Sequence, residues 1–169
     1  TGRVMLLGPT MDARTAFDIQ QRLPHLAIRM KEHSRRAMAI AERLEMMKVP
    51  VNYPGLTSHP QHKLITSLLN EGFGYGGIFT IDCQTAEKAE ALMSFLQNRE
   101  RFGLIAVSLG YFDTLMSCSS TSTSSEIAEE KQKRMGISPG LVRISIGLTG
   151  SLDARIDQIK RAVKEVGLA

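Results

Sequence analysis

The stretch Gly140-Leu-Val-Arg-Ile-Ser-Ile-Gly147 decides the fold of this chain. Its side chains alternate with the two-residue period of a β-strand, with Val142, Ile144 and Ile146 on one face and Leu141, Arg143 and Ser145 on the other. Both faces are largely apolar, so we expect a central, mostly covered strand, in which a charge is costly unless an anion meets it. The planar guanidinium of Arg143 matches a carboxylate in a bidentate way. Arg143 therefore either binds a ligand carboxylate at the end of this strand or forms an internal ion pair with an aspartate or glutamate of the chain.

Size and composition indicate a globular chain with a substantial core. The chain has 169 residues, which suits one domain, and 43% of them are hydrophobic. Its net charge of +4 is mild and spread along the sequence, so neither nucleic-acid binding nor membrane binding is indicated. Cys83 and Cys118 have neither metal-ligand spacing nor a disulfide framework, which favours reduced thiols and a cytoplasmic protein. The first residue, Thr1, is neither an initiator methionine nor part of a signal peptide, so we expect a fragment or a processed product.

Turn and periodicity signals divide the chain into helices and strands. Further strands are predicted at 49–53, 78–83 and 104–109, and helices at 11–44 with a break before Pro24, at 58–70, 86–97, 126–135 and 152–166. The serine- and threonine-rich run from Met116 to Ser125 is typical of a loop by its composition. We predict an α+β fold, in which an antiparallel or mixed sheet is covered by helices on one face and preceded by a long N-terminal helix. We divide the chain into an N-terminal segment with the long connecting helix, residues 1–47, and an α+β domain, residues 48–169.

Two motifs permit a binding function but have a simpler structural interpretation. His59 and His62 are three residues apart, which permits metal ligation on one helical face, yet no third ligand is in view and a capping or turn role is favoured. The glycine-rich run from Gly72 to Gly77 could cradle phosphate, but it leads into a strand and no Gly-Lys-Ser/Thr follows it. We favour a close backbone approach beside a neighbouring strand for these glycines. The sequence thus predicts no metal site.

Three motifs resemble, in order and spacing, those of the pyridoxal-phosphate enzymes of cysteine and methionine metabolism. They are the run from Gly136 to Gly147, the run Ala106-Val-Ser-Leu-Gly110, and Tyr53-Pro-Gly-Leu followed by His59-Pro-Gln-His62. The resemblance extends from about Pro9 to Val166 and is strongest to the methionine gamma-lyases of plant type. It implies the C-terminal domain of a fold-type I enzyme, whose design is the α+β arrangement predicted above. From the residues alone, a ferredoxin-like domain or a regulatory small-molecule-binding domain stays open.

The resemblance also implies roles for individual residues. Arg143 matches the arginine that grips the substrate α-carboxylate, and Ser108 matches the serine beside the catalytic lysine, whose amine its hydroxyl would hold. Val107 and Leu109 would shape the pocket for the substrate side chain, and an apolar Val107 favours an uncharged thioether such as methionine. Thr123 falls on the threonine of the family's Met-Thr-His loop, where it would help to hold the same arginine or the carboxylate. In this chain Ser-Thr-Ser replaces Met-Thr-His.

The family binds pyridoxal 5'-phosphate as a Schiff base on a lysine in a Ser-x-Thr-Lys setting, and no lysine of this chain has that setting. We therefore expect the lysine and the cofactor contacts upstream in a longer parent chain, and the 169-residue chain alone to be inactive. The parent would cleave methionine by α,γ-elimination to methanethiol, 2-oxobutanoate and ammonia, as a homo-oligomer built from two dimers. The alternatives are γ-replacement, as in cystathionine gamma-synthase or O-acylhomoserine sulfhydrylase, and a non-catalytic domain that binds a small carboxylate.

Overall fold

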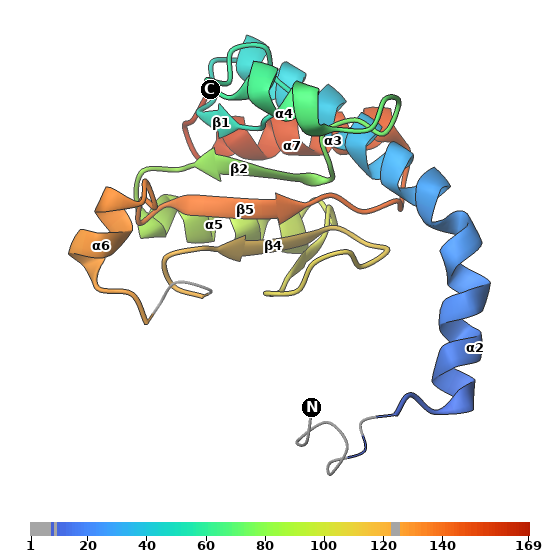
Figure 1. Cartoon of the computed structure of the whole chain (residues 1–169). Helices are drawn as coiled ribbons and strands as arrows, with labels where there is room; N and C mark the ends of the chain where they lie inside the picture. The colour runs from blue at the N-terminus through green and yellow to red at the C-terminus, as the bar shows by residue number, and fades with distance from the viewer. Residues whose placement is uncertain (1–7, 9, 123–125) are drawn as a thin grey trace.

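A mixed five-stranded sheet organises the molecule (Figure 1). The computed structural model describes residue 8, residues 10–122 and residues 126–169. The strands are β1 (Val51–Asn52), β2 (Ile78–Asp82), β3 (Leu104–Ile105), β4 (Leu115–Cys118) and β5 (Leu141–Ser145), in the spatial order β1-β2-β5-β4-β3. The pair β3 and β4 is parallel, and the other three pairs are antiparallel. The predicted mixed sheet is therefore confirmed, and β5 is its central strand as expected.

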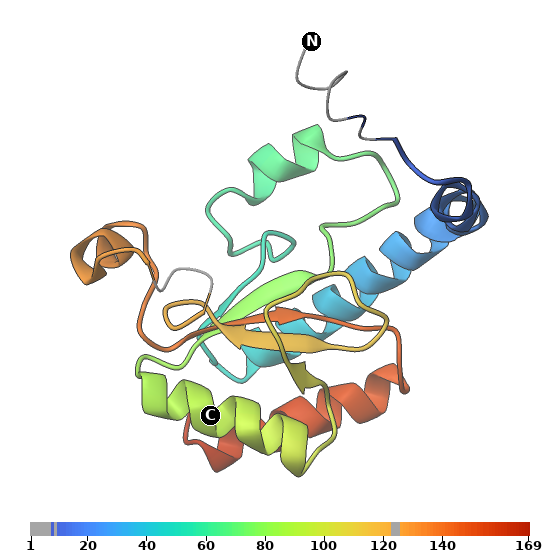
Figure 2. The same ribbon diagram turned by 90° about the horizontal axis from the view of Figure 1, so that it is seen from below.

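The two faces of the sheet differ in character. One face carries apolar side chains of the three inner strands that are almost fully buried, namely Phe79, Ile81, Met116, Val142 and Ile144. Helices α5 (Ala86–Asn98) and α7 (Leu152–Glu165) lie along this face in Figure 2, with α3 (Leu26–Met46) beside them. The other face carries Arg143 and Ser145, so the expectation of two largely apolar faces is wrong for this side. The predicted cover of one face by helices is confirmed. The Arg143 face has no such layer of packed helices in the described part of the chain.

Side-chain caps set the starts of both covering helices. The Thr85 hydroxyl accepts a hydrogen bond from the amide of Lys88, and the Ser151 hydroxyl accepts one from the amide of Ala154. Each cap satisfies an amide that the first helical turn leaves unpaired. The buried stripe of α5 follows the helical period and consists of Ala89, Leu92, Met93 and Leu96. The predicted starts of these helices are confirmed.

The N-terminal helix is interrupted where Pro24 predicts a break. Helix α2 (Ala13–Arg22) ends at a 3-10 turn, η1 (Leu23–His25), from which α3 continues. Proline removes a backbone donor and clashes with the preceding turn, which explains the interruption. None of the ten residues of α2 is buried, whereas α3 enters the core from Ser34 onward. Figure 1 shows α2 extending away from the sheet, while the second half of α3 packs against it.

The strand β4 contradicts the loop interpretation of the serine-rich run. Its four residues Leu-Met-Ser-Cys are all buried, so no in-and-out alternation marks them as a strand. The run read as a loop therefore begins with a strand that pairs with β5. The strand predicted at 104–109 is also shorter than expected, because β3 ends at Ile105 and the chain leaves the sheet after the bond from the Ala106 amide to the Met116 carbonyl.

Two short helices complete the fold. Helix α4 (His62–Leu68) lies on the opposite side of the sheet from α5 and α7 in Figure 2, and α6 (Glu129–Arg134) precedes β5. In the part of the chain that the structure describes, no helix combines the length and the apolar character needed to cross a membrane. The division of the chain after residue 47 stays a prediction, although Ala37, Ile40 and Leu44 of α3 share one core with the strands.

Candidate functional site

Arg143 lies in the middle of the central strand, not at the strand end that the sequence suggested. In the register of the sheet it is flanked by Thr80 of β2 and by Ser117 of β4. Directly opposed residues of neighbouring strands project to the same face. Thr80, Arg143 and Ser117 therefore form a polar row across the three inner strands, on the face opposite the apolar core.

The guanidinium of Arg143 is held by backbone carbonyls. Its Nη2 atom donates to the carbonyl oxygens of Val107 at 3.1 Å and Ser108 at 3.3 Å. Among the residues that the structure describes, none of the ion pairs involves Arg143. The alternative of an internal ion pair thus lacks support, and the positive charge remains available to an external anion.

Three polar atoms of this row are buried without a hydrogen-bond partner. They are the Nε atom of Arg143, the hydroxyl of Thr80 and the hydroxyl of Ser117, and Ser117 is only 3% exposed. Native structures pair most buried polar groups, because an unpaired one costs roughly 1–3 kcal/mol. The same row contains three of the four such atoms found in the described chain. This concentration makes the row the candidate site of the described chain.

The structure brings together most of the residues that the sequence nominates. Val107, Ser108 and Leu109 are exposed on the segment that follows β3, and the first two supply the carbonyls that Arg143 binds. Thr123 lies outside the described residues. Sequence reasoning missed Thr80 and Ser117, and only the pairing register of three strands reveals them.

A polar network holds in place the ends of the segment that follows β3. Arg155 of α7 donates to the carbonyls of Arg101 and Thr149 at 2.8 Å and 3.1 Å and forms an ion pair with Asp113 at 3.6 Å. Burial lowers the pKa of Arg155, and the Asp113 carboxylate opposes that effect. The amide of Gly147 donates to the Thr114 hydroxyl at 2.9 Å. These bonds tie the end of β5 to the start of β4, and so fix both ends of the segment that faces Arg143.

A small pocket adjoins the Arg143 face. It has a volume of about 320 Å³, and it lies between the N-terminal half of α3 and the segment that contains Leu109. Ser145, the next residue of β5 on the Arg143 face, lines it together with His33. The Nδ1 atom of His33 lies 2.6 Å from the carbonyl oxygen of Ile146, and since a carbonyl only accepts, this nitrogen carries the proton. His33 therefore anchors α3 to the end of β5 beside the pocket.

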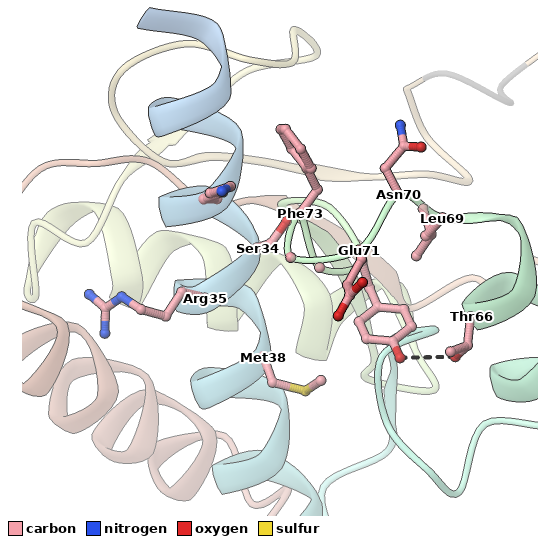
Figure 3. A pocket seen from close by; sticks show the side chains of 12 residues that line it. Ser34, Arg35, Met38, Thr66, Leu69, Asn70, Glu71 and Phe73 are labelled. Atoms are coloured by element: carbon pink, nitrogen blue, oxygen red, sulfur yellow. Dashed lines mark hydrogen bonds between the residues drawn. The ribbon is translucent and has the colours of Figure 1, made fainter.

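A larger pocket lies elsewhere, between α3, α4 and the glycine-rich run (Figure 3). Its volume is about 540 Å³, its lining includes Met38 and Glu71, and the bond between Tyr75 and Thr66 lies at its edge in Figure 3. None of the buried unpaired polar atoms of the described chain belongs to its lining. This pocket therefore lacks the unmet hydrogen bonds that mark the Arg143 face.

The glycine-rich run makes a close approach to a helix, not to a strand as predicted. A Cβ atom on Gly74 would lie 2.7 Å from the Cβ of Ser34 in α3, and one on Gly77 would lie 2.9 Å from the Cβ of His33. The Ser34 hydroxyl also accepts a hydrogen bond of 3.0 Å from the amide of Gly76. The glycines thus permit α3 to approach the chain just before β2.

The two histidines near α4 serve the local backbone. The Nδ1 atom of His62 lies 3.0 Å from the carbonyl oxygen of Pro54, and His59 Nδ1 accepts a bond from the amide of Gln61 at 3.1 Å. In the described residues, no three of the side chains His, Cys, Asp and Glu are grouped as metal ligands would be. These contacts agree with the capping and turn role that the sequence favoured.

Comparison with known proteins places the chain in a family. The model of the Cys/Met metabolism PLP-dependent enzymes matches residues 3–164. The chain belongs to this family. It is 53% identical to methionine gamma-lyase of Arabidopsis thaliana over 161 residues, which are 95% of this chain and 36% of that protein. It is 33% identical to a cystathionine beta-lyase of Lactococcus lactis, over 94% of this chain and 40% of that protein.

Solved structures of the family have the same fold. A protein assigned as an O-acetylhomoserine (thiol)-lyase from Campylobacter jejuni, solved with a pyridoxyl-lysine phosphate, superposes with a TM-score of 0.83 at 28% identity. A cystathionine gamma synthase from Xanthomonas oryzae gives a TM-score of 0.80 at 27% identity. Each match covers 96% of this chain but 39% and 41% of the respective structures. The chain thus spans about two fifths of the length of these relatives, and its fold is that of fold-type I PLP enzymes.

The Arg143 face suits one part of the chemistry of this family. Pyridoxal phosphate supplies an electron sink once it is joined to an amino group, and a protein lysine normally carries it. The strands β2, β4 and β5 and the segment from Val107 to Phe112 contain no lysine. A guanidinium with an unpaired Nε, flanked by two unpaired hydroxyls, fits a carboxylate instead. These residues can therefore hold the amino acid, while they do not fit the covalent attachment of the cofactor.

Proposed function

We propose that the chain is the substrate-carboxylate part of a PLP-dependent carbon–sulfur lyase. Arg143 would bind the α-carboxylate of a sulfur amino acid, and the lysine that carries the cofactor would come from an upstream part of a longer parent. The observation that carries this proposal is the half-buried Arg143, which has no ion pair among the described residues and a buried unpaired Nε. An arginine placed in this way costs free energy unless an anion meets it.

The fixed fork of Arg143 would orient the substrate as well as bind it. A bidentate carboxylate cannot rotate freely, so the bonds at the substrate Cα take one direction relative to the sheet. The hydroxyl of Ser108 is exposed on the same segment and would hold the amine of the catalytic lysine. Val107 and Leu109, also exposed there, would contact the substrate side chain, and Thr123 would support the carboxylate. In this arrangement the chain binds and orients, while the chemistry at Cα depends on the cofactor.

We favour α,γ-elimination of methionine as the reaction of the parent. The 53% identity to methionine gamma-lyase supports this choice, and the apolar Val107 suits an uncharged thioether. The second candidate is γ-replacement, which the similarity to an assigned O-acetylhomoserine (thiol)-lyase and a cystathionine gamma synthase favours. A non-catalytic carboxylate-binding domain is the third. A cytoplasmic homo-oligomer, built as a dimer of dimers, completes the proposal.

Steady-state kinetics of the complete protein that contains this chain test the proposal. Methionine alone should give methanethiol and 2-oxobutanoate, whereas a γ-replacement enzyme would need O-acetylhomoserine and sulfide. Arg143→Lys keeps the charge but loses the fork, so KM for methionine should rise about tenfold or more. Arg161→Lys is the matched control, because this exposed arginine forms a bidentate pair with Glu100 at 2.9 Å and 2.6 Å on α7. Equal KM values in the two variants would overturn the role of Arg143, and recovery of methionine cleavage by the 169-residue chain with added cofactor would overturn the upstream lysine.

A further inference from the structure

The side chain of Arg143 reaches the segment that follows β3. In the sheet, β4 lies between β5 and β3, and the two carbonyls that Arg143 Nη2 binds belong to the segment just after β3. Ser117 is the residue of β4 directly opposite Arg143. Opposed residues share a face of the sheet, so the side chains of Arg143 and Ser117 are neighbours on the Arg143 face.

In the described chain, two neighbouring polar groups, the Arg143 Nε–H and the Ser117 hydroxyl, each lack a hydrogen-bond partner that the other could supply. The Arg143 Nε–H can only donate, and the Ser117 hydroxyl can accept. Both atoms are buried and neither has a partner among the described residues. Ser117 is 3% exposed, so bulk water does not supply one. Because the two residues are register partners, the Ser117 hydroxyl is placed to accept from the Arg143 Nε–H when the guanidinium reorients around a bound carboxylate.

We infer that Ser117 is a positioning residue for Arg143, whose Nε–H it accepts when a carboxylate binds the guanidinium. This inference rests on the proposed function of Arg143. With Nε held by Ser117 and Nη2 by the carbonyls of Val107 and Ser108, the guanidinium plane is fixed from two sides. The carboxylate then meets the edge formed by Nη1 and the remaining N–H of Nη2, and approach along the Nε edge is excluded. Ser117 thus determines which edge of the Arg143 guanidinium binds the substrate carboxylate.

Thr80 provides an internal comparison on the opposite flank. Its hydroxyl is also buried and unpaired, and it is the register partner of Arg143 on β2. However, β2 lies on the side of β5 away from β3, and the carbonyl partners of Arg143 belong to the segment that follows β3. Removing the Thr80 hydroxyl should therefore leave substrate binding nearly unchanged, although it changes the same kind of group in the same row.

The test uses four variants of the complete protein: Ser117→Ala, Ser117→Thr, Thr80→Val and Arg143→Lys. Ser117→Ala should raise KM for methionine about tenfold with a smaller change in kcat, the effect of one hydrogen bond to a charged group. Ser117→Thr keeps a hydroxyl and should restore binding, and Thr80→Val should change KM less than twofold. Because Ser117→Ala removes an unpaired buried hydroxyl, its thermal midpoint should not fall below that of the wild type.

A binding readout separates positioning from general damage. Inhibition should be compared for an unreactive carboxylate-bearing analogue of methionine and for 3-(methylthio)propylamine, which lacks the carboxylate. Ser117→Ala should weaken only the first inhibitor, and equal weakening of both would overturn the inference. If Arg143→Lys raises KM but Ser117→Ala does not, the inference fails and the proposed function stands. If Arg143→Lys has no effect on KM, the proposed function fails.

Discussion

Arg36 and Arg155 are buried arginines with a structural role in this chain. Both are more than nine-tenths buried, and all of their guanidinium nitrogens have partners. Arg36, for example, donates to the carbonyls of Thr149 and Gly150 at 3.0 Å and 2.9 Å. Arg143 differs because its buried Nε is left unpaired. Among the described residues, Arg29 also has a buried unpaired Nε, so this contrast supports the proposed role of Arg143 only together with its polar neighbours Thr80 and Ser117.

The site could be predicted from the sequence only as far as single residues carry a signal. Arg143 stands out because a charge interrupts an apolar alternating strand. The sequence pattern does not mark Ser117 or Thr80 as site residues. A serine within a serine-rich run is typical of a loop, and a threonine is common in strands. Their place beside Arg143 arises from register, which joins residues that are far apart in the sequence. Long-range pairing is the information that composition and periodicity do not contain.

Gly147 is a residue-scale test of how tightly β5 and β4 are joined. A Cβ atom at this position would lie 2.3 Å from the backbone carbon of Asp113 and 2.4 Å from the amide nitrogen of Thr114. Backbone atoms cannot move aside as a flexible side chain can, so Gly147→Ala should destabilise the chain by about 2–3 kcal/mol. Urea unfolding followed by circular dichroism measures this change.

Gly72→Ala is the control for this prediction. Gly72 has a φ of 77° but open space around it, so alanine there should cost about 1 kcal/mol for the left-handed backbone alone. An equal or smaller loss of stability in Gly147→Ala than in Gly72→Ala would contradict the proposed close contact between the two strands.

At the scale of elements, the sequence predicts best the helix ends and breaks that are set by residues of the helix itself. The caps Thr85 and Ser151 and the break at Pro24 are local effects, and each is found where predicted. The strand β4 is not local in this sense, because it is covered on both sides and shows no alternation. Its strand conformation is imposed by β5 and β3, between which it pairs. Elements defined by their neighbours are therefore the ones that sequence patterns miss.

The ion pairs of Glu32 within α3 predict a pH dependence of stability. Hydrogen bonds from Arg35, and then from Arg36, lower the pKa of Glu32 from 4.5 to about 2. A carboxyl whose pKa is lowered in the folded state contributes stability above its unfolded pKa and loses it as pH falls. The contribution of Glu32 is thus complete above pH 4.5 and is lost between pH 4.5 and about 2.

The variant Glu32→Gln removes this contribution. At neutral pH it should lower the free energy of unfolding by about 1 kcal/mol, a modest value because the pair is partly exposed. The difference between wild type and variant should shrink as the pH is lowered through this range, and urea unfolding at several pH values measures it. A difference that stays constant down to pH 2 would show that Glu32 does not titrate in the way described.

At the scale of the whole molecule, two features point away from the covered core. The Arg143 face of the sheet is polar, and α2 extends beyond the sheet with all of its residues exposed or nearly so (Figure 1). Relatives that match this chain are more than twice as long, since it covers 36% of one and 40% of another. A longer polypeptide could cover both features at once, which is why we propose that the site is completed by an upstream part of the parent.

The exposed apolar side chains of α2 and early α3 predict how the 169 residues behave alone. Phe17 and Leu23 are each 58% exposed and Ile28 is 69% exposed, and they are distributed along the segment from α2 through η1 to the start of α3. Several large apolar side chains exposed along one segment promote association in water. The purified chain should therefore self-associate as its concentration rises, and sedimentation velocity should show a mass above that of the monomer.

The double variant Phe17→Glu/Leu23→Glu should shift this mass toward that of the monomer, whereas Leu68→Glu, at an equally apolar residue that is 75% exposed on α4, should not. A wild-type chain that stays monomeric at all concentrations, or an equal effect of Leu68→Glu, would show that α2 is not the surface that needs a partner.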